Sequence, residues 1–262
     1  MWFVPASALN GEQRQIMPTQ VASRMPCCLL RVAQSFSQRN ATSPIQIEEI
    51  LQTQRSLELV DSLGIALRRH GSDKSTTHNY HLLYGLLLSS FNRPVKLLEI
   101  GLGSNDVGIP SNMGAYGHPG ASIRAFRDVC PGSSLFGADI DQTILVEGIK
   151  TFVVDQTVAS SFSAITKGAG VGFDLIIDDG LHSPDANLNT LWFALNHLSS
   201  EGYFVIEDIP DAALPIWFTV QLMGFQARYK SVVIRARQSY MFLITARASL
   251  PSVEVGESFS PL

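Results

Sequence analysis

What this sequence of 262 residues has little of excludes several classes of protein. Its three cysteines, Cys27, Cys28 and Cys130, form no CxxC pair and are odd in number, so neither a disulfide framework nor a zinc site is expected. The net charge is −4, and no basic run is longer than a pair such as Arg68-Arg69, which disfavours nucleic-acid binding. No apolar run approaches the roughly 18 residues of a membrane-spanning helix. We therefore expect a cytoplasmic protein whose partners include neither nucleic acid nor membrane.

The composition, 45% hydrophobic and 16% charged, is sufficient for one sizeable core with an appendage. Arginine far outnumbers acidic residues near the start, so residues 1–44 are expected to be a poorly ordered or atypical leader, with a transit-like presequence as the alternative. Residues 45–92 are predicted to be an N-terminal helical segment. Residues 93–250 are predicted to be the functional α/β domain, and residues 251–262 a C-terminal tail.

Hydrophobic periodicity predicts two helices followed by alternating strands and helices. Apolar residues at helical spacing indicate helices at 45–69 and 78–91, with later helices at 120–130, 185–199 and near 212–222. Strands are expected at 95–101, 133–140, 149–156, 173–179, 202–209, 225–237 and 239–247. Continuous apolar strands separated by helices are typical of a parallel sheet covered on both faces. The predicted fold is therefore α/β, with a doubly wound, mostly parallel seven-stranded sheet and N-terminal helices. Trp192 and Phe193, at helix spacing, are predicted to be core residues.

Acidic residues stand at the carboxyl ends of five consecutive predicted strands. They are Glu99, Asp139, Asp155, Asp178, Asp179, Glu207 and Asp208. In a doubly wound sheet these ends meet at one edge, where ligands bind. Acids also favour strand-to-loop junctions and helix N-caps, which would account for one or two of them. Acids after five strands in a row favour a binding site.

The segment "EIGLGSND" indicates a cofactor-binding turn, because Gly101 and Gly103 would let the backbone pass close to a ligand. The dinucleotide fingerprint fails, since Asp106 occupies the third glycine position and no helix follows at once to meet a pyrophosphate. S-adenosylmethionine, a cofactor without phosphates, fits better, with Glu99 below the turn.

Further along the same edge, Asp139 would accept both ribose hydroxyls of this cofactor, because a carboxylate has two oxygens for a diol. Asp155 and Gln156 would contact the adenine amine. The predicted cofactor-binding set is completed by Asn105, Ser122 and Asp178.

Asp179, Glu207 and Asp208 follow strands that are expected to be neighbours. Three converging carboxylates repel one another unless a cation is present, and hard oxygen ligands suit Mg²⁺, or Mn²⁺ as a substitute. His182 follows on the loop above, with an ordinary pKa that suits a general base. The loop 104–118, rich in glycine and proline, would close over the site. Residues expected to line it are Lys74, His78 and Tyr80.

These segments together resemble a known family. "SDKSTTHNYHLLYGLL", "LLEIGLGSN", "GASIRAFRDVCPGSSLFGADID", "VDQT", "FDLIIDDGLH" and "GYFVIEDI" are similar to the metal-dependent sugar O-methyltransferases of macrolide biosynthesis, of the mycinamicin and macrocin type. The resemblance implies a Rossmann-like methyltransferase fold. It also implies that Asp179, Glu207 and Asp208 hold Mg²⁺ and that His182 is the base. Leu181 stands where the family usually has serine.

The function expected from the sequence is metal-assisted transfer of a methyl group from S-adenosylmethionine to a hydroxyl of a small molecule, such as a sugar or a glycosylated natural product. A catechol-type O-methyltransferase, a dinucleotide-dependent oxidoreductase and a non-catalytic binding module are the alternatives. The expected partner is a small-molecule acceptor, and a homo-oligomer is compatible with the sequence.

Overall fold

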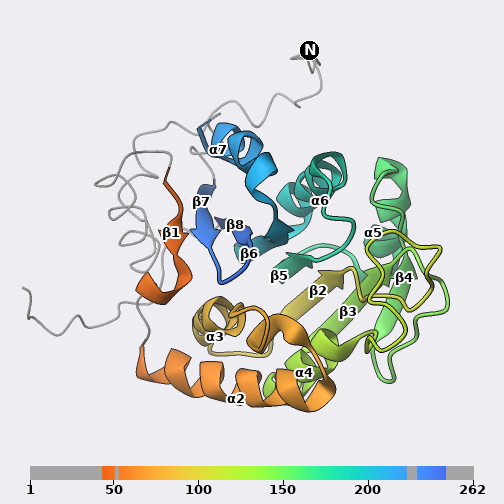
Figure 1. Ribbon diagram of the computed structural model, residues 1–262. Helices are drawn as coiled ribbons and strands as arrows, with labels where there is room; N and C mark the ends of the chain where they lie inside the picture. Colours follow the sequence, from red (N-terminus) through yellow and green to blue (C-terminus); the bar gives the residue numbers. More distant parts are fainter. Residues whose placement is uncertain (1–42, 51–52, 223–228, 246–262) are drawn as a thin grey trace, which may run out of the picture.

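A central, mostly parallel sheet dominates the computed structural model, which describes residues 43–50, 53–222 and 229–245 (Figure 1). Its strands are β1 (Ile45–Gln46), β2 (Lys96–Ile100), β3 (Ser134–Asp139), β4 (Lys150–Val153), β5 (Phe173–Asp178), β6 (Leu198–Ile209), β7 (Lys230–Arg235) and β8 (Tyr240–Thr245). They are arranged in the order β1-β7-β8-β6-β5-β2-β3-β4, and only β8 runs antiparallel to its neighbours. This order brings β5 between β2 and β6, so the segments that follow these three strands lie side by side.

Helices cover both faces of the sheet (Figure 1). One layer contains α2 (Gln54–His70), α3 (His81–Ser89) and α4 (Ala121–Val129); the other contains α5 (Ser163–Ala169), α6 (Pro184–His197) and α7 (Leu214–Leu222). Short 3-10 turns are η4 (Ile47–Glu49), η5 (Asp73–Ser75), η6 (Ala159–Phe162) and η7 (Asp211–Ala213). Adjacent strand residues bury their side chains in opposite layers: Leu97 packs with the α2–α4 side and Leu98 with the α5–α7 side. This period of two explains why the strands read as continuous apolar runs.

The predicted fold class is confirmed, and the sheet has one strand more than predicted. The helix expected at 45–69 is wrong at its start: Ile45–Gln46 pairs with β7 at the sheet edge, and α2 begins only at Gln54. The reason is local. The Thr53 side chain accepts a hydrogen bond from the backbone of Ser56, and the Ser56 side chain accepts one from Thr53 in return, a capping box that fixes the helix start.

Two further expectations had different outcomes. Phe193 is buried as predicted, whereas Trp192 is 60% exposed, because the two neighbours lie on different faces of α6. Most of the predicted leader and the tail, together with Cys27 and Cys28, lie outside the described residues. Among the residues described, no helix is both long and apolar enough to cross a membrane.

Candidate active site at the carboxyl edge of the sheet

The glycine turn after β2 lies directly against the end of β5. Gly101 has φ +90°, and a Cβ there would overlap the carbonyl oxygen of Asp179, so only glycine fits this close approach. The turn is held by Asp139 at the end of β3: one carboxylate oxygen accepts the amides of Leu102 and Gly103 at 2.7 and 3.0 Å. The predicted turn is thus built by three adjacent strand ends.

A cavity of about 270 Å³ opens above this turn. Five of the nine predicted cofactor-binding residues line it, and Asp179 borders it as well. The five are Gly101, Gly103, Asp139, Asp155 and Gln156. Ile109, Pro110 and Ser111 of the loop 104–118 line the same cavity, and the Ser111 hydroxyl donates to the carbonyl of Leu181 at 3.2 Å. The loop therefore lies over the cavity.

Several lining residues already have partners within the protein. The second oxygen of Asp139 accepts the amide of Asp141 at 2.9 Å. The Gln156 amide group donates to Asp178 and accepts from Leu181, at 2.7 and 2.8 Å. These bonds fix the shape of the cavity, and the ribose and adenine roles of these residues stay predictions.

The other four predicted cofactor-binding residues do not line the cavity. Asp178 is fully buried behind Gln156 and also accepts from Asn187 at 3.0 Å. Ser122 donates to buried Glu99 at 2.6 Å. Asn105 ties the loop together by donating to the carbonyls of Gly114 and Gly117. These residues support the walls of the cavity.

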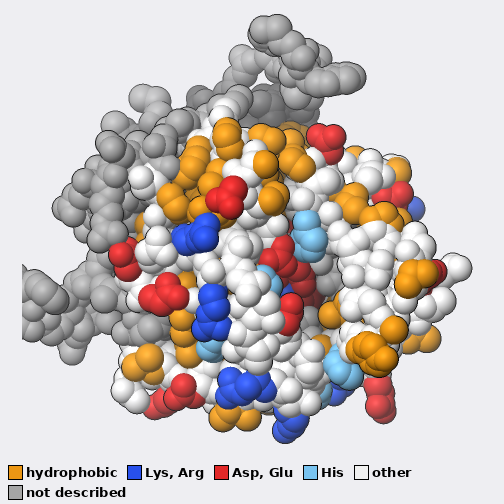
Figure 2. Space-filling model, viewed as in Figure 1, with side chains coloured by type: hydrophobic (Ala, Val, Ile, Leu, Met, Phe, Trp, Pro, Cys, Tyr) orange, Lys and Arg blue, Asp and Glu red, His pale blue; other side chains and the backbone are white. Residues whose placement is uncertain are grey.

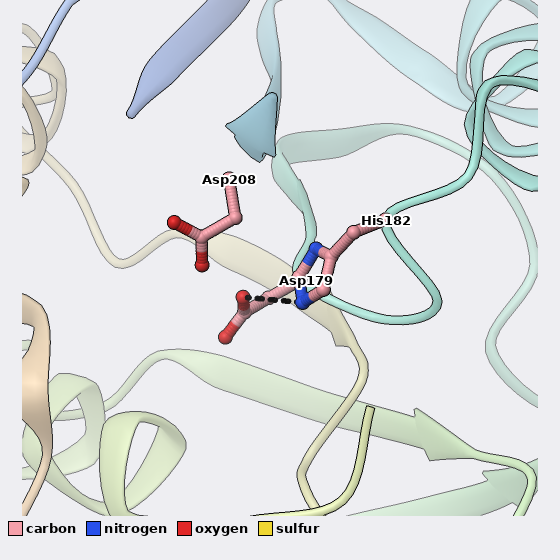
Figure 3. A group of neighbouring side chains, drawn as sticks. All are labelled: Asp179, His182 and Asp208. Atoms are coloured by element: carbon pink, nitrogen blue, oxygen red, sulfur yellow. Dashed lines mark ion pairs between the residues drawn. The ribbon is translucent and has the colours of Figure 1, made fainter. Parts of the chain in front are cut away.

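The predicted metal ligands gather beside the cavity. Acidic side chains and histidines meet in the middle of this face of the molecule (Figure 2). The side chains of Asp179, His182 and Asp208 point toward one another, and each offers a ligand atom within 4.8 Å of the other two (Figure 3). His182 Nε2 lies 4.0 Å from Asp179 Oδ1, and His182 Nδ1 is buried with no hydrogen-bond partner among the described residues. The carboxylates of Asp179 and Asp208 suit a divalent cation, so two of the three predicted ligands fit the metal that the sequence predicts, and the imidazole of His182, the predicted base, lies beside them.

Glu207, the third predicted ligand, lies beside this group and is almost completely buried. One of its carboxylate oxygens accepts a hydrogen bond from Lys74, and the other accepts one from Tyr84 on α3. Burial raises the pKa of Glu207 well above its usual range, against the opposing charge of Lys74. Its role as a metal ligand stays a prediction.

Lys74 lies at the centre of the carboxylates. Its Nζ donates to Asp179 at 2.5 Å and to Glu207, and lies 3.7 Å from Glu99, while the side chain is only 3% exposed. Burial lowers the pKa of Lys74, but the charges of these carboxylates outweigh it and raise the pKa well above its usual range. Burial raises the pKa of Glu99 to about 7, against the opposing effect of Lys74.

Asp208 is held from the side of α3. Tyr80 and Ser239 both donate to its Oδ1, and His78, stacked on Tyr80, places Nδ1 3.8 Å from the same atom. Burial raises the pKa of Asp208, but the hydrogen bond from Tyr80 and the charge of His78 outweigh it, so the pKa lies below its usual value. The carboxylate is therefore ionised at neutral pH.

The segment that runs from η5 through α3 contributes more to the site than the sequence predicts. Lys74, His78 and Tyr80 were expected only to line it, and Tyr84 was not predicted. A signal for Tyr84 exists, because Tyr80 and Tyr84 are four residues apart and so share a helix face.

Comparison with known proteins agrees with the resemblance seen in the sequence. No protein-family model matches the chain. The chain is 34% identical over 130 residues to mycinamicin VI 2''-O-methyltransferase of Micromonospora griseorubida. This match covers 47% of this chain and 29% of that protein. The chain is also 28% identical over 172 residues to 8-demethyl-8-alpha-L-rhamnosyl tetracenomycin-C 2'-O-methyltransferase of Streptomyces olivaceus. This match covers 64% of this chain and 43% of that protein. The matched regions span less than half the length of these curated relatives.

Among solved structures, the MycE methyltransferase of the mycinamycin pathway, crystallised with Mg and SAH, matches with a TM-score of 0.57 at 21% identity. The match covers 71% of this chain and 55% of that one. This likeness shows that the chain has the Rossmann-like fold of class I methyltransferases.

Proposed function

We propose that this protein is an S-adenosylmethionine-dependent, metal-assisted O-methyltransferase that acts on a hydroxyl of a sugar or a glycosylated natural product. The observation that carries the proposal is the position of Asp179. It borders the cavity above the glycine turn and is also a member of the Asp179–His182–Asp208 group. A methyl donor in that cavity and a hydroxyl held at that group would therefore be neighbours.

The relatives support the acceptor class. One is named for a 2''-O-methyl transfer on mycinamicin VI, and another for a 2'-O-methyl transfer on a rhamnosyl tetracenomycin. MycE has also been crystallised with Mg, SAH and mycinamycin VI together. We extend the cofactor, the metal and the glycoside class to this chain as part of the proposal.

In this mechanism Asp179, Glu207 and Asp208 would hold a divalent ion, and the residues around the cavity would hold the cofactor. When bound, the cofactor would supply an electrophilic methyl group and the ion would make the acceptor hydroxyl more acidic. His182 would accept the proton that this hydroxyl loses as its oxygen bonds to the methyl carbon and the sulfur–carbon bond breaks, a contribution on the order of 10²–10⁴ in rate. The loop 104–118 excludes water from above the cavity.

A dinucleotide-dependent oxidoreductase is disfavoured by the same geometry. After the glycine turn the chain enters the loop over the cavity, and α4 begins only at Ala121, with no side-chain cap. No helix N-terminus therefore follows the turn directly to receive a pyrophosphate.

Binding and turnover measurements test the proposal. Isothermal titration of the full chain is expected to show uptake of S-adenosylmethionine and S-adenosylhomocysteine and none of NADH. With glycosylated macrolides that have a free sugar hydroxyl as acceptors, labelled methyl transfer is expected to stop in EDTA and to return with Mg²⁺ or Mn²⁺. Uptake of NADH alone would contradict the proposal, and full transfer in EDTA would contradict its metal.

A further inference from the structure

Lys74 is a buried charge whose ammonium group is paired with carboxylates. It lies on η5, outside the sheet, yet its ammonium group reaches the ends of three adjacent strands through Glu99, Asp179 and Glu207. Lysine is almost never fully buried unless it is paired. Its backbone amide is 3.4 Å from the Ser72 hydroxyl, so the turn that carries it is itself anchored.

Lys74 supplies a positive charge in the midst of several carboxylates and offsets part of their combined negative charge. Four carboxylates, those of Glu99, Asp179, Glu207 and Asp208, lie around or beside it, and Glu99 and Glu207 are almost completely buried. Converging carboxylates cannot all remain ionised unless a cation compensates them. The hydrogen bonds from Tyr80 and Tyr84 orient Asp208 and Glu207 but add no positive charge.

We propose that Lys74 is a positioning residue that serves as the internal counter-cation of this site, pairing with Asp179 and Glu207 and holding them in place before a divalent ion binds, and limiting how tightly that ion is held. The inference depends on the proposed function, because the ion is the one that the methyltransferase requires. The ammonium group cannot also be the catalytic base, since its protons are donated to carboxylates.

This role has a physical consequence. The ammonium group and a divalent ion neutralise the same carboxylates, so each weakens the binding of the other. With Lys74 present, the site stays formed without the ion, and the ion binds with moderate affinity. Without Lys74, the carboxylates repel one another when no ion is bound, and the ion binds more tightly.

Three variants test this role: Lys74→Met, Glu207→Gln and the double variant K74M/E207Q, with Lys150→Met as a control. Lys150 is an exposed lysine whose Nζ donates to the carbonyl of Gly168, away from this edge. The readouts are the melting temperature in EDTA and the Mn²⁺ dissociation constant from titration followed by electron paramagnetic resonance.

In EDTA we expect K74M to melt about 10 °C below the wild type, because breaking a buried ion pair leaves its partner charge exposed to repulsion. Mn²⁺ should bind K74M at least about tenfold more tightly than the wild type. The double variant, which removes one positive and one negative charge together, should recover most of the melting temperature and return the Mn²⁺ affinity toward that of the wild type. K150M should match the wild type in both measurements.

Unchanged or weaker Mn²⁺ binding by K74M would overturn the inference. So would a change in melting temperature of the double variant that equals the sum of the changes in K74M and E207Q. If K74M does not fold, the double variant decides: folding of K74M/E207Q supports the counter-cation role, and failure of both variants overturns it. A wild type that binds no Mn²⁺ would instead contradict the metal in the proposed function, and the melting temperatures in EDTA would still decide whether Lys74 compensates Glu207.

Discussion

At the residue scale, backbone strain is concentrated at the proposed site. Of the non-glycine residues described, three have a left-handed backbone: Ser111, His182 and Asp208, with φ of 59°, 57° and 52°. Such a conformation costs on the order of 1–3 kcal/mol per residue and persists only where the surroundings enforce it. Two of the three belong to the group beside the cavity and the third belongs to the loop above it, which supports this edge as the functional one.

His182→Asn separates the role of the imidazole from that of the backbone, because asparagine tolerates a left-handed conformation but cannot act as a base. We expect turnover to fall by about 10²–10⁴-fold while affinity for S-adenosylhomocysteine changes little. Steady-state kinetics and isothermal titration check the two parts. The control is His70→Ala, which removes an imidazole that pairs with Asp128 on α4 and does not line the cavity. Near-normal turnover of H182N would remove His182 from the mechanism.

Asp174, at the amino end of β5 and so at the opposite end of the strand from the site, gives a prediction about stability. Burial raises its pKa, but hydrogen bonds from Arg93 at 2.7 and 2.8 Å, and from the Lys96 amide and Ser199, outweigh it and lower the pKa below its ordinary value of 3.8. A carboxyl with a lowered folded-state pKa stabilises the fold above its unfolded-state pKa, and this stabilisation is lost as the pH falls through the folded-state pKa.

Asp174→Asn should therefore cost about 1–3 kcal/mol of unfolding free energy at pH 7, and the difference from the wild type should shrink as the pH falls below about 4. Urea titrations at several pH values measure it. If the difference in unfolding free energy between D174N and the wild type stays constant down to pH 2, the charge of Asp174 is not what stabilises the fold.

Residue types at strand ends were predictable from the sequence, but their partners were not. The pattern of acids after strands located Asp179, Glu207 and Asp208 correctly at one edge. Lys74 was expected only to line the site, because nothing in a local pattern shows that a lysine in a short turn will reach three strand ends. Asp139 illustrates the same limit: the sequence indicates its edge, but not that both of its oxygens accept backbone amides.

At the element scale, the glycine turn sets the distance between β2 and β5. Gly101→Ala would place a Cβ against the carbonyl of Asp179 in a backbone conformation that L side chains rarely adopt. The turn can relieve the overlap only by moving away from Asp179, which would deform the cavity.

We therefore expect G101A to weaken S-adenosylhomocysteine binding by at least about tenfold, as measured by isothermal titration. Gly172→Ala is the matched control: Gly172, which precedes β5 at the opposite end of that strand from Asp179, also has a positive φ, but no atom lies within 4 Å of a Cβ built there. Equal losses in the two variants would show that backbone strain, rather than closeness to Asp179, causes the effect.

The elements themselves were predictable where a short apolar run has turn residues on both sides. The central strands β2, β3 and β5 begin and end within two residues of their predicted bounds. The error at residues 45–53 arose because the apolar residues Ile47 and Ile50 fit a helical period as well as they fit the buried edge turn that they form. Thr53 and Ser56, whose capping box starts α2, distinguish between the two.

At the scale of the whole molecule, the sheet order explains why distant segments form one site. Because β5 lies between β2 and β6, the glycine turn, the segment from Asp179 to His182 and the pair Glu207-Asp208 follow neighbouring strands. Helix α3 packs over the same edge and adds the tyrosines that orient two of the carboxylates.

The central claim, that a methyl-donor cavity and a divalent-ion site share Asp179, is tested most directly by a crystal structure of the full chain with S-adenosylhomocysteine and Mn²⁺. We expect cofactor density in the cavity above Gly101, and an anomalous Mn²⁺ peak bound by Asp179 and Asp208 at the edge of that cavity. Cofactor density elsewhere, or a Mn²⁺ peak that does not contact Asp179, would contradict the account.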